Sequence, residues 1–320
     1  QYRDDGPLYR WQSGVDAIAV AVAGAPTDAQ AVLVTTERIA MTIKTQPRLV
    51  EWSDSEDFTT WTPAVTNRAG SQTLAGSGDL KAIVQVGKEI LIISTKDAHV
   101  GRFLGAPFVY GFDQVGEGCG TIAANSVVEL GGKVYWASQG GFWTYDGAVR
   151  KLDSEIDDWW ADKVDTEATT KTFGFALPTY REVWWFFQSK EQPECDTYVI
   201  YNYEDGTWAY GSLPRTVGIA QDPANTSIYV GWDGILWDHD LEGTNIPEGY
   251  QAFAETGPLE LGQGGQIMGV QQVFPDLTPD PASPDGAAAR LEILGKDWPS
   301  PNEPERVYGP YDLDRPISTT

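Results

Sequence analysis

The sequence is poor in the residues that carry most protein chemistry. It has two histidines, two cysteines and two methionines in 320 residues. Two cysteines make no disulfide framework, and Cys119 and Cys195 lack metal-ligand spacing, so buried free thiols are expected rather than a bridge. A catalytic triad needs a histidine beside a serine and an acid. His99 and His239 each lie near aspartates, but both are better explained as residues at strand ends.

Basic residues and long apolar runs are also scarce. The chain carries 22 Lys and Arg against 46 Asp and Glu, a formal net charge of −24. Such a surface repels phosphates and anionic membranes, which argues against tight binding of nucleic acid. No apolar run approaches the roughly 18 residues of a membrane helix, so no membrane insertion is expected. The start lacks a signal peptide and both ends look cut, which predicts a processed chain or a fragment.

Turn formers and aromatic residues are abundant. The chain has 34 Gly, 20 Pro, 13 Trp and 14 Tyr. Aromatic residues favour strands, and glycine and proline mark turns. Between residues 125 and 152, four short apolar runs are separated by Gly131-Gly132, Gln139-Gly140-Gly141 and Asp146-Gly147. Such dipeptides suit hairpin turns, so these residues are predicted to form a four-stranded antiparallel meander.

Similar meanders recur at an irregular spacing of roughly 40 residues, which is typical of β-propeller blades. We therefore predict an all-β fold, a β-propeller of about five to six four-stranded blades that is either complete or incomplete. The propeller is expected to occupy residues 1–250. A smaller β-rich module is expected over residues 251–320, with Pro- and Asp-rich surface loops such as Asp276–Ala289.

Two aromatic segments are expected to pack inside this fold. The spacing of Ile156, Trp159, Trp160 and Val164 predicts a helix over residues 153–164 with one apolar face. The segment REVWWFF, Arg181–Phe187, is apolar on both faces of a strand. A strand covered on both faces is the favoured interpretation, and an aromatic ligand platform is the alternative.

The most unusual segment is VEWSDSEDFTTWTPA, which begins at Val50. It combines two tryptophans with a cluster of acids and hydroxyls. Asp54, Glu56 and Asp57 are weak candidates for a calcium site, because the segment lacks the glycine and the distal glutamate of an EF-hand loop. With 46 acidic residues, a chance pair of carboxylates is nearly certain, so such pairs do not identify a glycosidase. No other pattern indicates a cofactor, and we expect none.

Within that segment, SEDFTTW resembles the Asp-box of sialidase-type propellers, S-x-D-G-x-T-W, with Phe58 in place of the glycine. NYEDGTW, residues 202–208, is a second imperfect copy. In the families that carry it, the box is a structural turn between the outer strands of a blade. The resemblance therefore implies structural turn residues: Ser55, Asp57, Thr60, Trp61, Asp205, Gly206 and Trp208.

A longer resemblance links several motifs in order. WSDSEDFTTWTP, GAPFVYGFDQVGEGCG, YDG and YVIYNYEDGTWAYG together resemble the tail nozzle, or tail hub, proteins of short-tailed bacteriophages over roughly residues 45–320. The resemblance rests on turn and core motifs. It implies a structural virion protein of the tail, not an enzyme, in a homohexameric ring around a DNA channel. The implied partners are further copies, an adaptor or portal-proximal protein, and tail fibres, with viral DNA passing without specific binding.

A carbohydrate-binding or sialidase-like propeller is the alternative. Sialidases clamp a substrate carboxylate with several arginines and use a Tyr-Glu pair as nucleophile. Arginine is sparse here and forms no cluster along the sequence, although a cluster could assemble in space. A secreted adhesive propeller is a third possibility.

Overall fold

The computed structural model describes residues 6–45, 47–167, 169–219, 227–230, 234–239, 269–270, 272–273, 290–296, 305–312 and 317–318. The chain divides into two compact units, Gln1–Thr244 and Asn245–Thr320. The boundary expected after residue 250 and the loop expected at residues 276–289 lie outside the described residues, so both stay predictions.

Four antiparallel sheets of four consecutive strands dominate the first unit. Sheet 1 consists of β3 (Ala31–Val34), β4 (Ala40–Ile43), β5 (Leu49–Trp52) and β6 (Gly70–Thr73). Sheet 2 consists of β7 (Leu80–Val86), β8 (Glu89–Ser94), β9 (Asp97–Phe103) and β10 (Tyr110–Glu117).

Sheet 3 consists of β11 (Val128–Leu130), β12 (Lys133–Ser138), β13 (Gly141–Tyr145) and β14 (Val149–Lys151). It is the meander expected over residues 125–152, preceded by the 3-10 turn η1 (Ala124–Ser126). Sheet 4 follows with β15 (Phe173–Leu177), β16 (Glu182–Phe187), β17 (Thr197–Asn202) and β18 (Trp208–Ser212); the 3-10 turn η2 (Thr169–Lys171) precedes it.

Two smaller groups of strands complete the first unit. Sheet 5 has three strands, β19 (Val217–Ile219), β20 (Ser227–Val230) and β21 (Leu236–His239). A short N-terminal hairpin pairs β1 (Tyr9–Arg10) with β2 (Val20–Ala21).

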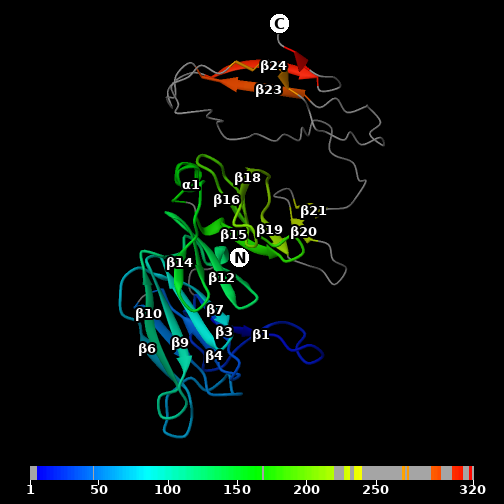
Figure 1. Cartoon of the computed structure of the whole chain (residues 1–320). Coiled ribbons are helices and arrows are strands. Elements are labelled where there is room, and N and C mark those ends of the chain that lie inside the picture. Colours follow the sequence, from blue (N-terminus) through cyan, green and yellow to red (C-terminus); the bar gives the residue numbers. More distant parts are fainter. Residues whose placement is uncertain are drawn as a thin grey trace. The chain divides into compact units, whose positions relative to one another are not determined.

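The first strands of successive sheets are neighbours: β3 lies beside β7, β7 beside β11, β11 beside β15, and β15 beside β19. The sheets thus follow one another in chain order and share an inner edge made of first strands (Figure 1). This radial repetition of antiparallel meanders is the arrangement of propeller blades. The predicted all-β, propeller-type fold is confirmed.

Each pair of successive four-stranded sheets shares a buried cluster. Ile39, Met41 and Val50 of the first sheet's region pack with Leu80, Ile90 and Ile92 of sheet 2. Leu91 and Val100 of sheet 2 pack with Val134 and Trp136 of sheet 3. Tyr145 of sheet 3 also donates a hydrogen bond to the Glu89 carboxylate of sheet 2. The sheets are therefore joined through their faces, as blades are.

We call the packed interface between two successive sheets a joint. The joint between sheets 3 and 4 is lined by aromatic side chains and includes the helix α1 (Asp157–Lys163). The helix is shorter than the predicted span of residues 153–164, because Ile156 takes the N-cap position and the preceding residues form a turn. Trp160 is fully buried and donates its indole N–H to the Ser138 carbonyl at 2.9 Å. Trp159 is half-buried and its ring lies 4.1 Å from that of Tyr210.

The segment REVWWFF contributes strand β16, whose two faces belong to different clusters. Trp185 and Phe187 lie in the cluster shared with sheet 3, whereas Trp184 and Phe186 pack on the opposite face with Phe173 and other residues. The prediction of a strand covered on both faces is confirmed.

The second unit contains two described pairs of strands. β22 (Gln272–Val273) pairs with β25 (Ile317–Ser318), and β23 (Arg290–Gly295) pairs with β24 (Arg306–Asp312). Both pairs are antiparallel. In the part of the chain that the structure describes, no helix is both long and apolar enough to cross a membrane.

Candidate functional site

The first Asp-box-like segment forms the connection between β5 and β6, the third and fourth strands of sheet 1. Asp57 is its centre. One carboxylate oxygen accepts hydrogen bonds from the Thr59 amide at 2.9 Å and the Thr59 hydroxyl at 2.6 Å, and the other accepts the Thr60 hydroxyl at 2.7 Å. These bonds lower the pKa of Asp57 to about 2, with the Thr59 hydroxyl as the largest cause. The carboxylate is therefore held in its charged form by its own turn.

The neighbouring residues close the same turn. Asp54 donates its amide to the Thr60 carbonyl at 2.8 Å, and its carboxylate accepts the amides of Ser55 and Arg68. The Ser55 hydroxyl donates to the Glu37 carbonyl at 2.8 Å. Asp54 thus ties the start of this connection to its end.

The two tryptophans of the segment have separate roles. The Trp61 indole N–H donates to the Phe58 carbonyl at 2.7 Å, three residues away. Trp52 ends β5, donates its indole N–H to the Arg68 carbonyl at 2.7 Å, and is almost fully buried. Gly70 lies opposite it in β6, where an added Cβ would lie 2.5 Å from the indole. The ring of Trp52 therefore fills the space that this glycine leaves.

The three weak metal candidates do not converge on a common point. Asp54 and Asp57 each bind amides or hydroxyls of the turn, whereas Glu56 forms an ion pair with Arg38 at 2.9 Å. Across the residues that the structure describes, no group of three His, Cys, Asp or Glu side chains is arranged to hold a metal ion. The donor atoms are used for the turn instead.

The second Asp-box-like segment forms the equivalent connection in sheet 4, between β17 and β18. Its anchor is Asn202, whose side-chain oxygen accepts the amides of Glu204 at 3.0 Å and Asp205 at 3.2 Å. Gly206 has a φ of +72°, the left-handed region that favours glycine. Asp205 contributes its amide and is exposed. Sequence reasoning missed Asn202, although an asparagine two residues before a turn amide is the signature of an Asx-turn.

Trp208, the last residue of this copy, reaches far from its own turn. Its indole N–H donates to the Asp153 carbonyl at 2.8 Å. Its ring centroid lies 4.8 Å from that of Phe142 and 4.6 Å from that of Tyr201. The two copies thus occupy the same place in their sheets, but Trp61 bonds within its loop and Trp208 bonds across the joint between sheets 3 and 4.

All four motifs of the longer resemblance coincide with third-to-fourth strand connections. WSDSEDFTTWTP spans the connection of sheet 1, the GAPFVYGF stretch that of sheet 2, YDG that of sheet 3 and YNYEDGTW that of sheet 4. Motifs spread over more than 150 residues therefore mark one recurring element of a repeated fold.

Sequence reasoning also missed a buried ion pair at the joint between sheets 1 and 2. The Arg48 guanidinium contacts both carboxylate oxygens of Asp97, at 2.9 and 3.1 Å, and donates to the carbonyls of Ala75, Ser77 and Gly78. Both side chains are more than nine-tenths buried. Arg48 belongs to the turn before β5, and Asp97 begins β9 of sheet 2. No local pattern connects residues 49 positions apart, so the sequence held no signal for this pair.

Neither cysteine has the character of a nucleophile. Both are free and buried, as expected. Burial raises the pKa of Cys119 to about 11 and that of Cys195 to about 12. A reactive cysteine needs a stabilised thiolate, which these surroundings oppose.

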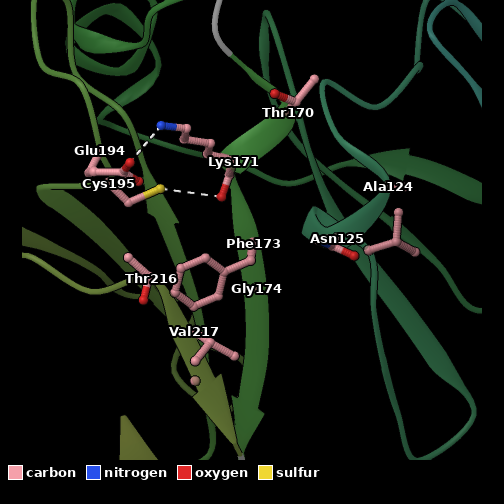
Figure 2. A pocket seen from close by; sticks show the side chains of 12 residues that line it. Ala124, Asn125, Thr170, Lys171, Phe173, Gly174, Glu194, Cys195, Thr216 and Val217 are labelled. Atoms are coloured by element: carbon pink, nitrogen blue, oxygen red, sulfur yellow. Dashed lines mark hydrogen bonds and ion pairs between the residues drawn. The ribbon is translucent and has the colours of Figure 1, made fainter. Parts of the chain in front are cut away.

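A cavity of about 550 Å³ lies among η1 and the first strands β15 and β19. In Figure 2, Lys171 and Glu194 form an ion pair at 2.7 Å at one side, and the Cys195 thiol contacts the Lys171 carbonyl. Phe173, Asn125 and Thr216 line other parts of it. The two charged side chains in its described lining neutralise each other, so the cavity shows no preference for an ionic ligand.

A sialidase clamp requires several arginines that converge on one point. Arg38 pairs with Glu56, Arg102 with Glu89 and Asp113, and Arg181 with Glu204. Arg48 is buried against Asp97. These arginines are each occupied by acids on separate connections or strands.

No family model matches the sequence, and a search of curated proteins finds no match. Similar solved structures include the extracellular domain of a one component system from B. thetaiotaomicron, at 9% identity and a TM-score of 0.44, over 69% of this chain and 27% of that one. A protein from Lactobacillus plantarum has 13% identity and a TM-score of 0.49, over 75% and 76% of the two chains. Virginiamycin B lyase from Staphylococcus aureus has 8% identity and a TM-score of 0.40, over 66% and 69%. These similarities support no functional assignment.

Proposed function

We propose that this chain is a structural subunit of the tail nozzle of a short-tailed bacteriophage, assembled as a hexameric ring in the virion. The ring would attach to an adaptor or portal-proximal protein, could carry tail fibres, and would pass viral DNA during ejection. The observation that carries the proposal is the placement of the four motifs. Each motif of the resemblance includes residues of the third-to-fourth strand connection of one four-stranded sheet.

The side chains of these motifs favour a structural role. Asp57 and Asn202 use their oxygens for turn amides and hydroxyls, and Trp208 binds a distant carbonyl. A motif used for architecture needs no converging catalytic groups. The thiols at Cys119 and Cys195 are likewise held protonated by burial.

The net charge of −24 suits a passage for DNA. Lysine and arginine side chains bind phosphates and release counterions, which would retard a moving duplex. An acidic wall repels phosphates and lets the duplex slide. The proposal therefore includes a lumen lined by acidic side chains.

The mass of the particle in solution tests the proposal. Native mass spectrometry of the purified chain is expected to give about six copies of the 35.0 kDa subunit, and electron microscopy a ring with an open centre. A stable monomer over the micromolar range would contradict the ring, and a lumen rich in Lys and Arg would contradict the passage mechanism.

A glycan array and a panel of glycosidase substrates test the carbohydrate alternative. The nozzle subunit is expected to show neither tight glycan binding nor turnover. Turnover that responds to substitutions lining the cavity near Phe173 would replace the nozzle proposal with the alternative.

A further inference from the structure

His99 lies inside strand β9 rather than at a strand end, so the sequence-based interpretation of this histidine is wrong. It pairs with Ile92 of β8 and Gln114 of β10, and only 3% of it is exposed. Neither ring nitrogen makes a hydrogen bond of normal geometry, although the Ala75 backbone lies close enough to act on the ring. A buried polar group so poorly paired carries a desolvation cost, which calls for an explanation.

The charged groups around His99 belong to the joint between sheets 1 and 2. The imidazole Nδ1 lies 3.7 Å from the nearer carboxylate oxygen of Asp97. That carboxylate is fully used: it accepts Arg48 on both oxygens, the Ser94 hydroxyl at 2.6 Å and the Ser77 amide at 3.1 Å. Asp97 is thus committed to other donors.

Among the described residues, Asp97 is the anion that acts on the ring and Arg48 is the cation. Asp97 already neutralises Arg48, and the facing residues of β8 and β10 are Ile92 and Gln114. A proton on His99 would therefore add a second positive charge to a buried site that holds one anion.

The electrostatic balance favours the neutral ring. Burial lowers the pKa of His99, and the positive charge of Arg48 acts in the same direction, whereas Asp97 and the Ala75 carbonyl oppose them. Because the pKa falls on folding, the unfolded chain binds the proton more readily. The stabilising effect of the neutral ring is thus present at neutral pH and is lost as the pH falls below 6.5.

We propose that His99 makes the joint between sheets 1 and 2 acid-sensitive: its protonation opens the contact around the Arg48–Asp97 ion pair. The segment that would move is residues 74–79, which links β6 to β7. The Leu74 amide bonds to the Arg48 carbonyl, and the Ser77 amide bonds to Asp97. Opening would release both amides.

Because histidines are few, the effect of His99 protonation can be separated from the general effect of acid on the stability of the fold. The sequence has only two histidines, and ordinary carboxylates titrate near pH 4. Histidine is the side chain whose ordinary pKa lies between pH 7.5 and 5.5, and the chain has His99 and His239, the latter in β21. Substitution of each histidine in turn isolates its share.

The first test is urea unfolding of the wild type, His99→Gln and His239→Gln at pH 7.5 and 5.5. When the pH falls from 7.5 to 5.5, the equilibrium constant for unfolding of the wild type is expected to rise by a factor up to about tenfold larger than that of His99→Gln. A factor of about ten is the largest that one histidine can contribute over this range. His239→Gln should keep the response of the wild type. An equal pH response in the wild type and His99→Gln would overturn the proposal.

The second test needs no variant. Amide hydrogen exchange, corrected for its intrinsic pH dependence, is expected to show lower protection of Leu74 and Ser77 at pH 5.5 than at pH 7.5. The Trp160 amide, bonded to the Ile156 carbonyl in α1 at 2.7 Å, is the internal reference. Unchanged relative protection, or a His99 titration midpoint at or above 6.5 by NMR, would also overturn the proposal.

Discussion

Two joints of the same propeller are built in different ways. Sheets 1 and 2 meet through mainly aliphatic side chains, the Trp52–Tyr110 ring contact and a buried ion pair, Arg48–Asp97. Sheets 3 and 4 meet through aromatic rings, with Phe142 lying 4.8 Å from Trp160, from Trp185 and from Trp208 between ring centroids. The sheets themselves share one topology, so the difference lies in the side chains between them.

The difference shows that neighbouring sheets of one repeated fold can be held together by different kinds of interaction. The ion pair is directional: the Arg48 guanidinium donates to four backbone carbonyls and one carboxylate, so loss of either partner leaves a buried charge. Aromatic rings tolerate small shifts because dispersion is not directional, and each ring adds buried area. We therefore expect the first joint to respond to charge and pH, and the second to volume.

The largest effect is expected from Arg48→Met. The variant leaves the Asp97 carboxylate buried without its guanidinium, and breaking a buried pair costs about 3–5 kcal/mol. Urea unfolding measures the loss. The double variant Arg48→Met with Asp97→Leu removes both charges and should recover part of it. A double variant whose loss equals the sum of the single losses would show that the two charges are not coupled.

A smaller loss is expected from Trp208→Ala at the aromatic joint. A buried tryptophan changed to alanine costs about 3–5 kcal/mol, and Trp208 is half-buried, so about 2–3 kcal/mol is expected. Trp208→Phe keeps an aromatic ring but removes the bond to the Asp153 carbonyl and part of the indole volume, so a smaller loss of about 1–2 kcal/mol is expected. Thermal unfolding of the two variants compares them, and equal losses would contradict a joint that depends on volume.

The matched change in the other copy is Trp61→Ala. Its indole bonds to a carbonyl three residues away within the same connection. The expected loss is about 1 kcal/mol or less, measured by the same unfolding experiment. A loss as large as that of Trp208→Ala would show that the two copies support the fold alike, against the comparison drawn above.

Features that depend on residues close together in the sequence were predicted more readily than features that depend on distant residues. The hairpin turns at Gly131-Gly132 and Asp146-Gly147 are local, so the meander of sheet 3 and the propeller-type repetition were readable from the sequence. The box residues were assigned to turns from a seven-residue pattern. Asn202 was missed because the pattern assigns the turn to an acid, whereas Asn202 stands where the pattern has its serine.

The features that were missed depend on tertiary contacts. Nothing near Arg48 indicates that its side chain crosses to Asp97, and nothing near His99 indicates burial without a hydrogen bond of normal geometry. The start of α1 was predicted too early: the helix begins at Asp157, and Ile156, the first residue of the apolar pattern, is its N-cap. Polar residues that make contacts between two sheets therefore show no regular spacing in the sequence.

The smallest effect is expected from Asp57→Asn, and it is distinguished by its pH dependence. The native pKa is about 2, below the ordinary aspartate value, so Asp57 stabilises the fold above about pH 4, and this stabilisation is lost as the pH falls toward 2. Asparagine cannot titrate and keeps only part of the accepting capacity for Thr59 and Thr60. The difference in unfolding midpoint between wild type and variant should therefore be greatest near pH 6 and shrink toward pH 3. Because the connection of sheet 1 bonds within itself, Asp57→Asn should change the midpoint of a Trp208 variant by the same amount as it changes that of the wild type. A different change would mean that the two copies are coupled through the sheets between them.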